Sequence, residues 1–479
     1  MTSLPPEQPE QPDIILVMSD EHSPRFSSVY GHPIVRTPNM ERLAGDGITF
    51  DAAYCASPIC VPSRMAFMTG RYPTRTETWD NGTPLRSDIP TFAHVMQSAG
   101  YETVLIGKMH FIGTDQLHGF SKRLVDDSKV CGTWIETNDW NEPDLPRPKA
   151  RQRLLNAGEG RTAHIEQDEE VLAAALNYLN ALPPRAQRNP IFLCVSFNAP
   201  HFPLRAPKHF DSYWPDNVDM PKITQAELDN QHPFHKRLRG YFDLNDVDAD
   251  STARGRASFY ALVTWFDELL GQLIDTVDTA PGLSQSPPLL AYVSDHGDMA
   301  GEHGLWWKCN FFEDSVRVPM IVRWPGQIEP GQRSATPVSL MDLSVTFAHL
   351  ASPPNAADIF FTEADGCDMR PWLGGGQDPD RAVISEYCGH AAARPIRMIR
   401  QGSWKYVYYH GEPDELYNLA DDPGEKSNLA EDDKFAETLR HLKQQVLAGW
   451  DADAIDRRVR LHQKERALIS SVEGRGVFE

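Results

Sequence analysis

Ionisable side chains directly follow four short apolar segments that lie far apart in the chain. These side chains are, in chain order, Asp20 and Glu21, Lys108 and His110, His201, and Asp295 and His296. One such residue after a strand is commonly a turn or cap residue, but four segments that all end in this way are better explained by a shared site. Because ligands of open α/β sheets bind beyond the carboxyl ends of the strands, we expect these side chains to meet.

Four of these residues have the chemistry of a metal site. Asp20, Glu21 and Asp295 offer carboxylate oxygens, and His296 offers an imidazole nitrogen. A set rich in hard oxygen ligands favours calcium, magnesium or manganese over zinc, which prefers nitrogen and sulfur. The alternative is that each pair of residues only caps the end of its own strand.

Cys60 is a candidate for a reactive thiol. It begins the sequence CVPSR at 60–64, and the proline in this sequence predicts the first turn of a helix. Backbone donors and the dipole at a helix N-terminus favour an anion, which would activate a thiolate there. The alternative is a buried and unreactive thiol, which is the state that we expect for Cys55, Cys194 and Cys309.

The apolar segments predict the strands that position these residues. The segments are short, rich in branched side chains and typical of strands buried on both faces, and they span residues 13–18, 102–106, 191–197, 289–294 and 320–323. Helical periodicity separates them, for example at 91–99 and most clearly at 258–277. The alternation predicts an α/β sandwich in which helices flank a large, mostly parallel sheet.

The character of the chain changes near residue 378. We expect four units, which are a loose tail at 1–12, a catalytic α/β domain at 13–377, a smaller α+β subdomain at 378–450 and an arm at 451–479. Within the subdomain, the alternating and aromatic segment 397–409 predicts antiparallel strands, and 435–447 predicts a helix. The basic arm has two interpretations, a solvated tail or a contact with a neighbouring subunit.

The composition excludes several classes of partner. The 46 Lys+Arg and 67 Asp+Glu residues give a net charge of −21, which argues against nucleic acid, so an anionic substrate would need a local cluster of positive charge. The apolar runs are far shorter than the roughly 20 residues of a membrane-spanning helix. The Pro- and Glu-rich start has no secretory pattern, and an odd count of seven cysteines suits free thiols, so we expect a cytoplasmic protein.

Several motifs resemble those of the type I sulfatases of the alkaline phosphatase superfamily. The sequence CVPSR at 60–64 with MTGR at 68–71 looks like the signature of that family. Further matches in type and order are Asp20, TPN at 37–39, GKMH at 107–110, PHFP at 200–203, SDHG at 294–297, Lys308, RVP at 317–319 and LYNL at 416–419. Within the family, the chain is most similar to bacterial choline-sulfatases and phosphonate monoester hydrolases, and segments 107–120 and 294–308 closely resemble the choline-sulfatase branch.

The resemblance implies an alkaline-phosphatase-like sandwich and a modified nucleophile. In that family a formylglycine-generating or anaerobic maturation enzyme oxidises the cysteine, here Cys60, to formylglycine. The hydrated aldehyde attacks sulfur and forms a covalent sulfo-enzyme. The implied metal, calcium first and manganese or magnesium as alternatives, would be bound by Asp20, Glu21, residue 60, Asp295 and His296. Relatives usually carry Asp, Asn or Gln where this chain has Glu21.

The resemblance also implies a role for each remaining site residue. Arg64 would orient the hydrated aldehyde and balance its charge, and Lys108 and Lys308 would hold the non-bridging oxygens. His201, together with Lys308, would protonate the leaving oxygen. His110 would take the proton whose loss releases sulfate. The cations among these residues would form the positive cluster that the net charge requires.

We therefore expect a sulfuric ester hydrolase that acts on a small organic sulfate monoester, such as an aryl or choline sulfate, and that forms a dimer or tetramer. The alternatives are a phosphonate monoester or phosphodiester hydrolase, favoured by His296 where many sulfatases carry Asn, and a catalytically dead anion-binding homologue. A choline ester would require aromatic faces around its quaternary ammonium. The aromatic candidates, each of which could instead belong to the core, are Trp134, Trp140, Trp306 and Trp307.

Overall fold

The predicted strands form the middle of one eight-stranded sheet. The computed structural model describes residues 11–127 and 148–473. Its central strands are all parallel and run side by side in the order β9 (Leu289–Ser294), β1 (Ile14–Asp20), β7 (Ile191–Pro200) and β4 (Glu102–Gly107). The expectation of a large, mostly parallel sheet is therefore confirmed.

Shorter strands extend the sheet at both edges. They are β5 (Lys122–Val125) beyond β4, and then β10 (Met320–Arg323), β2 (Ile48–Phe50) and β11 (Gln332–Ser334) beyond β9. Strand β10 runs antiparallel to both of its neighbours, β9 and β2. The carboxyl ends of the four central strands remain together at one edge of the sheet.

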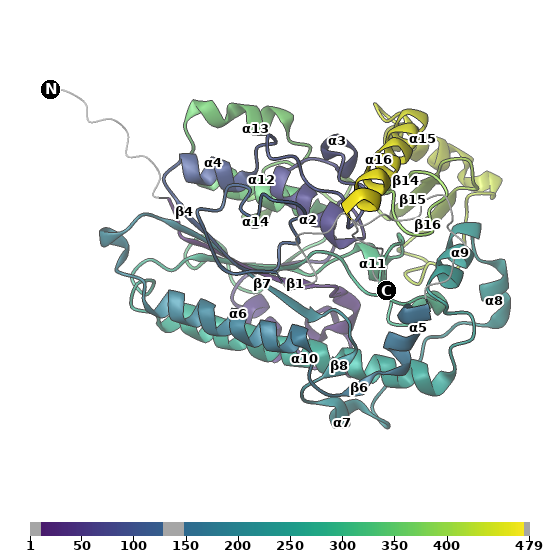
Figure 1. Ribbon diagram of the computed structural model, residues 1–479, viewed down its shortest axis with the longest axis horizontal. Coiled ribbons are helices and arrows are strands. Elements are labelled where there is room, and N and C mark those ends of the chain that lie inside the picture. The colour runs from purple at the N-terminus through teal and green to yellow at the C-terminus, as the bar shows by residue number, and fades with distance from the viewer. Residues whose placement is uncertain (1–10, 128–147, 474–479) are drawn as a thin grey trace.

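Helices cover both faces of the sheet (Figure 1). One face packs on α6 (Ala163–Asn180) and α10 (Ala249–Thr279), and the other packs on α2 (Cys60–Thr69), α4 (Phe92–Ser98) and α12 (Leu340–Leu350). Alternate residues of β1 enter the two cores, so every side chain of this strand is buried. Helix α10 is longer than its periodicity predicts because its polar first turn is capped by the Asp248 side chain.

A separate antiparallel sheet lies in the C-terminal part of the chain. Its strands are β13 (Ala382–Tyr387), β14 (Ile396–Gln401), β15 (Trp404–Tyr409) and β16 (Glu415–Asn418), in that order. Helix α15 (Ala436–Val446) packs on this sheet through Leu442 and Val446. The predicted antiparallel strands and their helix are confirmed.

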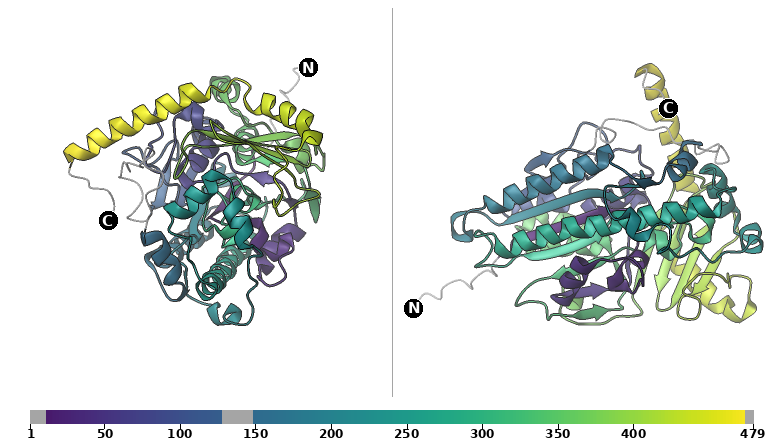
Figure 2. Two further views of the ribbon diagram at one scale, coloured as in Figure 1. Left: turned by 90° about the vertical axis from the view of Figure 1, so that its right-hand side faces the viewer. Right: turned by 90° about the horizontal axis from the view of Figure 1, so that it is seen from below.

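The basic arm forms helix α16 (Ala452–Glu473), which reaches outward past the body of the molecule (Figure 2). The guanidinium of Arg466 donates two hydrogen bonds, of 2.7 and 2.6 Å, to the buried carboxylate of Asp80. Arg458 pairs in the same bidentate way with Glu77. Two of the positive charges of the arm therefore form ion pairs within the same chain.

Two further findings concern the expectations drawn from composition. The six cysteines within the described ranges are all free thiols. No helix of residues 11–127 or 148–473 combines the length and the apolar character needed to cross a bilayer.

A buried lysine joins the C-terminal sheet to the main body, and its removal provides a test of the packing. Lys405 of β15 is fully buried, with its Nζ 3.1 Å from Glu313 Oε1 and 2.5 Å from Glu425 Oε1. We expect Lys405→Met to lower the free energy of unfolding by about 3–5 kcal/mol, because two carboxylates lose their buried cation. Urea denaturation measures this loss.

The matched control is Lys122→Met, which removes an exposed pair with Glu102 at 2.9 Å. Its expected effect is below about 1 kcal/mol. Equal losses for the two variants would contradict the role assigned to Lys405.

Candidate active site

The carboxyl ends of the central strands bring the predicted site residues together. Asp20 is the last residue of β1, and Asp295 directly follows β9. The backbone N–H of Glu21 donates to Asp295 Oδ1 at 3.1 Å, and the φ of Glu21 is 70°, in the left-handed region. The site residues that are nearly or fully buried are Asp20, Glu21, Cys60, Arg64, Lys108, Asp295, His296 and Lys308.

Arg64 lies at the centre of this arrangement and is completely buried. Its Nη2 donates to Asp20 Oδ2 at 2.9 Å and its Nε to Asp295 Oδ2 at 2.8 Å. Its Nη1 donates to the carbonyl oxygen of Lys108 at 2.8 Å. One guanidinium therefore joins the ends of β1, β9 and β4, a structural role that the sequence did not predict.

Cys60 is the first residue of α2, as the sequence predicted. Its Sγ lies 3.2 Å from His296 Nε2 and 3.9 Å from Asp20 Oδ1. Burial and Asp20 raise the pKa of the thiol, but Lys308, His296 and Lys108 outweigh them, and the pKa falls well below its usual range. The side chain at position 60 is therefore held where negative charge is stabilised.

The same residues fit a divalent metal ion. Asp20, Cys60, Asp295 and His296 each offer a ligand atom, and all of these atoms lie within 4.8 Å of one another. Neither carboxylate oxygen of the buried Glu21 accepts a hydrogen bond from any residue in the described part of the chain. A buried acidic set with unsatisfied oxygens is suited to a hard cation.

The orientation of His296 agrees with a ligand role. Its Nδ1 lies 3.0 Å from the Gly297 carbonyl oxygen, a contact that requires a proton on Nδ1. Its Nε2 is therefore the atom that faces Cys60. Burial lowers the pKa of His296, but the neighbouring Asp295 carboxylate outweighs this effect and raises the pKa to about 9.

Two lysines complete a positive cluster with Arg64. Lys108 Nζ lies 2.7 Å from Asp20 Oδ2, and Lys308 Nζ lies 3.3 Å from Glu21 Oε1. Burial lowers the pKa of Lys308, but the surrounding Cys60, Glu21 and Asp20 raise it well above its usual range. The cluster lies inside a protein of net charge −21 and supplies the local positive charge that binding of an anion needs.

The two remaining predicted histidines are half-buried at the same edge. His201 Nδ1 lies 2.6 Å from the Phe202 carbonyl oxygen, so Nε2 faces Glu21 at 3.4 Å. Burial and then Lys308 lower the pKa of His201 well below its usual value. The backbone N–H of His110 donates to Asp127 Oδ2 at 3.0 Å. Contacts thus join His201 to the buried site residues, and His110 follows the end of β4 at the same edge of the sheet. The individual roles of the residues stay predictions.

Sequence reasoning missed the residues that support the histidines. Asp127 holds the segment of His110, and Asp168 of α6 accepts hydrogen bonds from the backbone N–H groups of Asn198 and Ala199 at 2.7 and 2.8 Å. Burial raises the pKa of Asp168 to about 7. No helix is predicted here from the sequence, and the available signal was an acidic residue among the apolar residues that α6 buries.

The tryptophans do not form an open cage within the described ranges. Trp306 and Trp307 are each 2% exposed, and Trp307 packs between Phe202 and Phe242. These two side chains are therefore core residues or pocket wall. Trp134 and Trp140 lie outside the residues that the structure describes.

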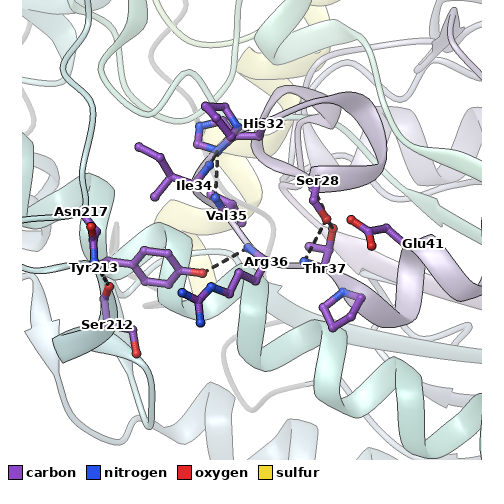
Figure 3. A pocket seen from close by; sticks show the side chains of 12 residues that line it. Ser28, His32, Ile34, Val35, Arg36, Thr37, Glu41, Ser212, Tyr213 and Asn217 are labelled. Carbon is purple, nitrogen blue, oxygen red and sulfur yellow. Dashed lines mark hydrogen bonds between the residues drawn. The ribbon is translucent and has the colours of Figure 1, made fainter.

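A cavity of about 450 Å³ lies beside the TPN motif (Figure 3). None of the residues that line this cavity is a predicted site residue. The side chains of buried Thr37 and half-buried Ser28 are hydrogen-bonded at 2.8 Å, and Asn39 donates to Asp267 of α10 at 2.9 Å. The motif at 37–39 therefore fixes the start of α1 (Pro38–Gly45) and does not supply a group to the site.

Comparisons with known proteins agree with this geometry. A sequence model of the sulfatase family matches residues 12–353, and a model described as N-sulphoglucosamine sulphohydrolase, C-terminal, matches residues 301–450. The chain is 35% identical to a choline-sulfatase of Rhizobium meliloti over 98% of this chain and 92% of that protein. It is 25% identical to an N-acetylglucosamine-6-O-sulfatase of Bacteroides thetaiotaomicron over 91% of this chain and 86% of that protein.

Solved structures share the fold at low sequence identity. A protein in complex with its substrate D-glucosamine-2-N,6-O-disulfate superposes with a TM-score of 0.72 at 22% identity, over 93% of this chain and 99% of that one. A phosphonate monoester hydrolase from Silicibacter pomeroyi gives the same TM-score and identity, over 92% of this chain and 95% of that one. The fold, the buried site and the family match lead to one conclusion: the chain belongs to the sulfatase family and is a sulfuric ester hydrolase.

Proposed function

We propose that the chain hydrolyses a small organic sulfate monoester with a formylglycine that is formed from Cys60. The observation that carries this proposal is the position of Cys60, which is buried at the first turn of α2 with its Sγ 3.2 Å from His296 Nε2. Arg64, Lys108 and Lys308 surround this position with positive charge, as an anionic ester requires.

The proposed cofactors supply two kinds of chemistry. A hydrated formylglycine at position 60 provides two hydroxyls on one carbon, one for attack and one whose proton is removed afterwards. A divalent cation, calcium first and manganese or magnesium as alternatives, provides Lewis-acid stabilisation of negative charge. Asp20, residue 60, Asp295 and His296 form the group that would hold it, and Glu21, which lies in a second group with Asp20 and His201, would be a fifth ligand.

The side chains of the protein bind the ester and move protons. Lys108 and Lys308 hold the non-bridging oxygens, and Arg64 keeps both aspartates oriented. Following the resemblance, we assign protonation of the leaving oxygen to His201 and Lys308, whose Nε2 and Nζ lie 3.4 and 3.3 Å from Glu21. His110 removes a proton, and the loss of this proton precedes the release of sulfate.

A phosphonate or phosphate ester hydrolase with the same site is the second candidate. His296 favours it, because the resemblance associates histidine at this position with the phosphonate hydrolase branch. The structural similarity to a phosphonate monoester hydrolase is consistent with it. The site itself would bind either tetrahedral anion, since a lysine ammonium acts as a point charge and imposes little geometry on the oxygens it binds.

The proposal for the substrate is tested by rates on paired substrates. We expect the matured protein to show a higher kcat/KM on 4-nitrophenyl sulfate than on 4-nitrophenyl phenylphosphonate, because the site is assigned to a sulfate ester. Steady-state assays at equal metal concentration measure both values. A higher kcat/KM on the phosphonate would reverse the ranking of the two candidates.

The metal proposal predicts a specific loss in Asp20→Asn. This change removes one carboxylate from the buried group of candidate ligands, Asp20, Cys60, Asp295 and His296, and leaves the shape of the side chain intact. We expect the bound calcium per chain to fall at least tenfold, as is typical when a metal site loses a charged ligand. Elemental analysis after dialysis measures the metal content.

The matched control for this variant is Asp13→Asn at the opposite end of β1. Asp13 is buried and pairs with Arg188 at 2.6 Å, so its loss affects stability and leaves the metal content unchanged. Wild-type metal content in Asp20→Asn would contradict the assigned ligand set.

Three further proposals concern partners and location. A maturation enzyme must recognise the segment around Cys60 before folding, because the residue is 1% exposed in the folded chain. The cytoplasmic location stays a prediction from the sequence. We also propose a homo-oligomer formed through α16, because Leu461, Leu468 and Ile469 place exposed apolar side chains at helical spacing.

The oligomer proposal predicts a dimer or tetramer in sedimentation equilibrium. Leu468→Glu places a charge in the centre of the exposed apolar face and should shift the protein toward monomer. A wild-type protein that sediments as a monomer at micromolar concentration would contradict the proposal.

A further inference from the structure

One loop carries both His296 and Lys308, on the two sides of the site. Within it, Asp298 Oδ1 accepts hydrogen bonds from the backbone N–H groups of Ala300 and Trp307 at 2.6 and 3.1 Å. These bonds draw the two ends of the loop together. Ala300, His303 and Trp307 all have positive φ angles, a backbone conformation that persists only where surrounding contacts support it.

A buried arginine of α10 provides such support from outside the loop. Arg256 is completely buried, and its Nη1 donates to the Ala300 carbonyl oxygen at 2.8 Å and to Glu302 Oε1 at 3.0 Å. Its Nη2 donates to Asp219 Oδ2 at 2.9 Å. The guanidinium therefore fixes both the backbone and a side chain of the loop to the longest helix.

Glu302 connects this loop to the segment that carries Glu21. Its Oε1 lies 3.3 Å from Arg25 Nη2, and Arg25 belongs to η1 (Pro24–Phe26), which closely follows Glu21. Arg25 also lies 3.6 Å from Asp314. On the site side, the same two segments meet in the pair Lys308–Glu21 at 3.3 Å. The ion pairs of Glu302 thus form a second tie between the two segments.

We propose that Arg256 and Glu302 are positioning residues for Lys308. They hold the loop of Lys308 against the segment of Glu21 and so set where the ammonium meets the anionic oxygens of the substrate. This inference rests on the proposed function, in which Lys308 binds those oxygens. A donor in a buried site is effective only when it is fixed before the substrate arrives, and a displacement of about 1 Å can lower the rate a hundredfold.

The test is a double-mutant cycle on matured protein with bound metal. We expect Glu302→Ala and Arg256→Ala each to lower kcat/KM on 4-nitrophenyl sulfate by roughly tenfold or more and to raise the inhibition constant of inorganic sulfate by a similar factor. We expect the double variant to lose about as much as the more affected single variant, because the two residues act as one unit. Calcium content per chain should stay at the wild-type value.

Two further variants keep the test informative if truncation impairs folding. Glu302→Gln keeps the shape and one acceptor oxygen, so it should change both constants in the same direction by a smaller factor. Arg188→Ala breaks the buried pair with Asp13, whose bonds of 2.8 and 2.6 Å lie at the opposite end of β1. It should lower the Tm while leaving kcat/KM and the sulfate inhibition constant unchanged.

The outcomes separate the positioning claim from the proposed function. Glu302 and Arg256 variants that lower the Tm as Arg188→Ala does, with wild-type kcat/KM and sulfate inhibition, would overturn the positioning claim. Lys308→Ala is the reference variant for the function. If it leaves sulfate inhibition and turnover unchanged, the role of Lys308 in the proposed function fails as well.

Discussion

The site depends on one buried guanidinium, which allows two carboxylates to lie side by side in the interior. Asp20 and Asp295 end neighbouring strands with no exposed surface, and two such carboxylates would repel each other in the interior. Arg64 lies between them at 2.9 and 2.8 Å and donates to both, and Lys108 Nζ adds a second positive charge 2.7 Å from Asp20 Oδ2. Since Arg64 lies one helical turn after Cys60, the same contact also fixes the position of residue 60 relative to the two carboxylates.

The charge of the site is the reverse of the charge of the protein. The chain carries −21 overall, which repels a small anion at long range, while Arg64, Lys108 and Lys308 gather positive charge in one buried place. Recognition of the anion therefore depends on short-range contacts within the site. This explains why the supporting network extends outward to Arg256 and Glu302, which contact neither Cys60 nor the proposed metal ligands.

Much of the fold and the site could be predicted from the sequence. The contacts that could not be predicted join residues far apart in the chain. The buried parallel strands are continuous apolar runs, so the residues that follow them, such as Asp20 and Asp295, could be assigned to one edge. The helix at Cys60 follows from its proline. By contrast, Asp127 and Asp168 act by accepting hydrogen bonds from distant backbone groups, and the sequence does not reveal which groups those are.

The same limit applies to Arg64, whose place in a motif suggests direct contact with the nucleophile and does not reveal two buried aspartates as partners. The central claim is that residue 60 works as an aldehyde hydrate, and the mass of the peptide containing residue 60 tests it most directly. In protein produced with a maturation enzyme, we expect a peptide in which one oxygen replaces the sulfur and two hydrogens, with turnover per chain proportional to the converted fraction. Fully active protein whose peptide keeps a plain thiol would contradict the claim.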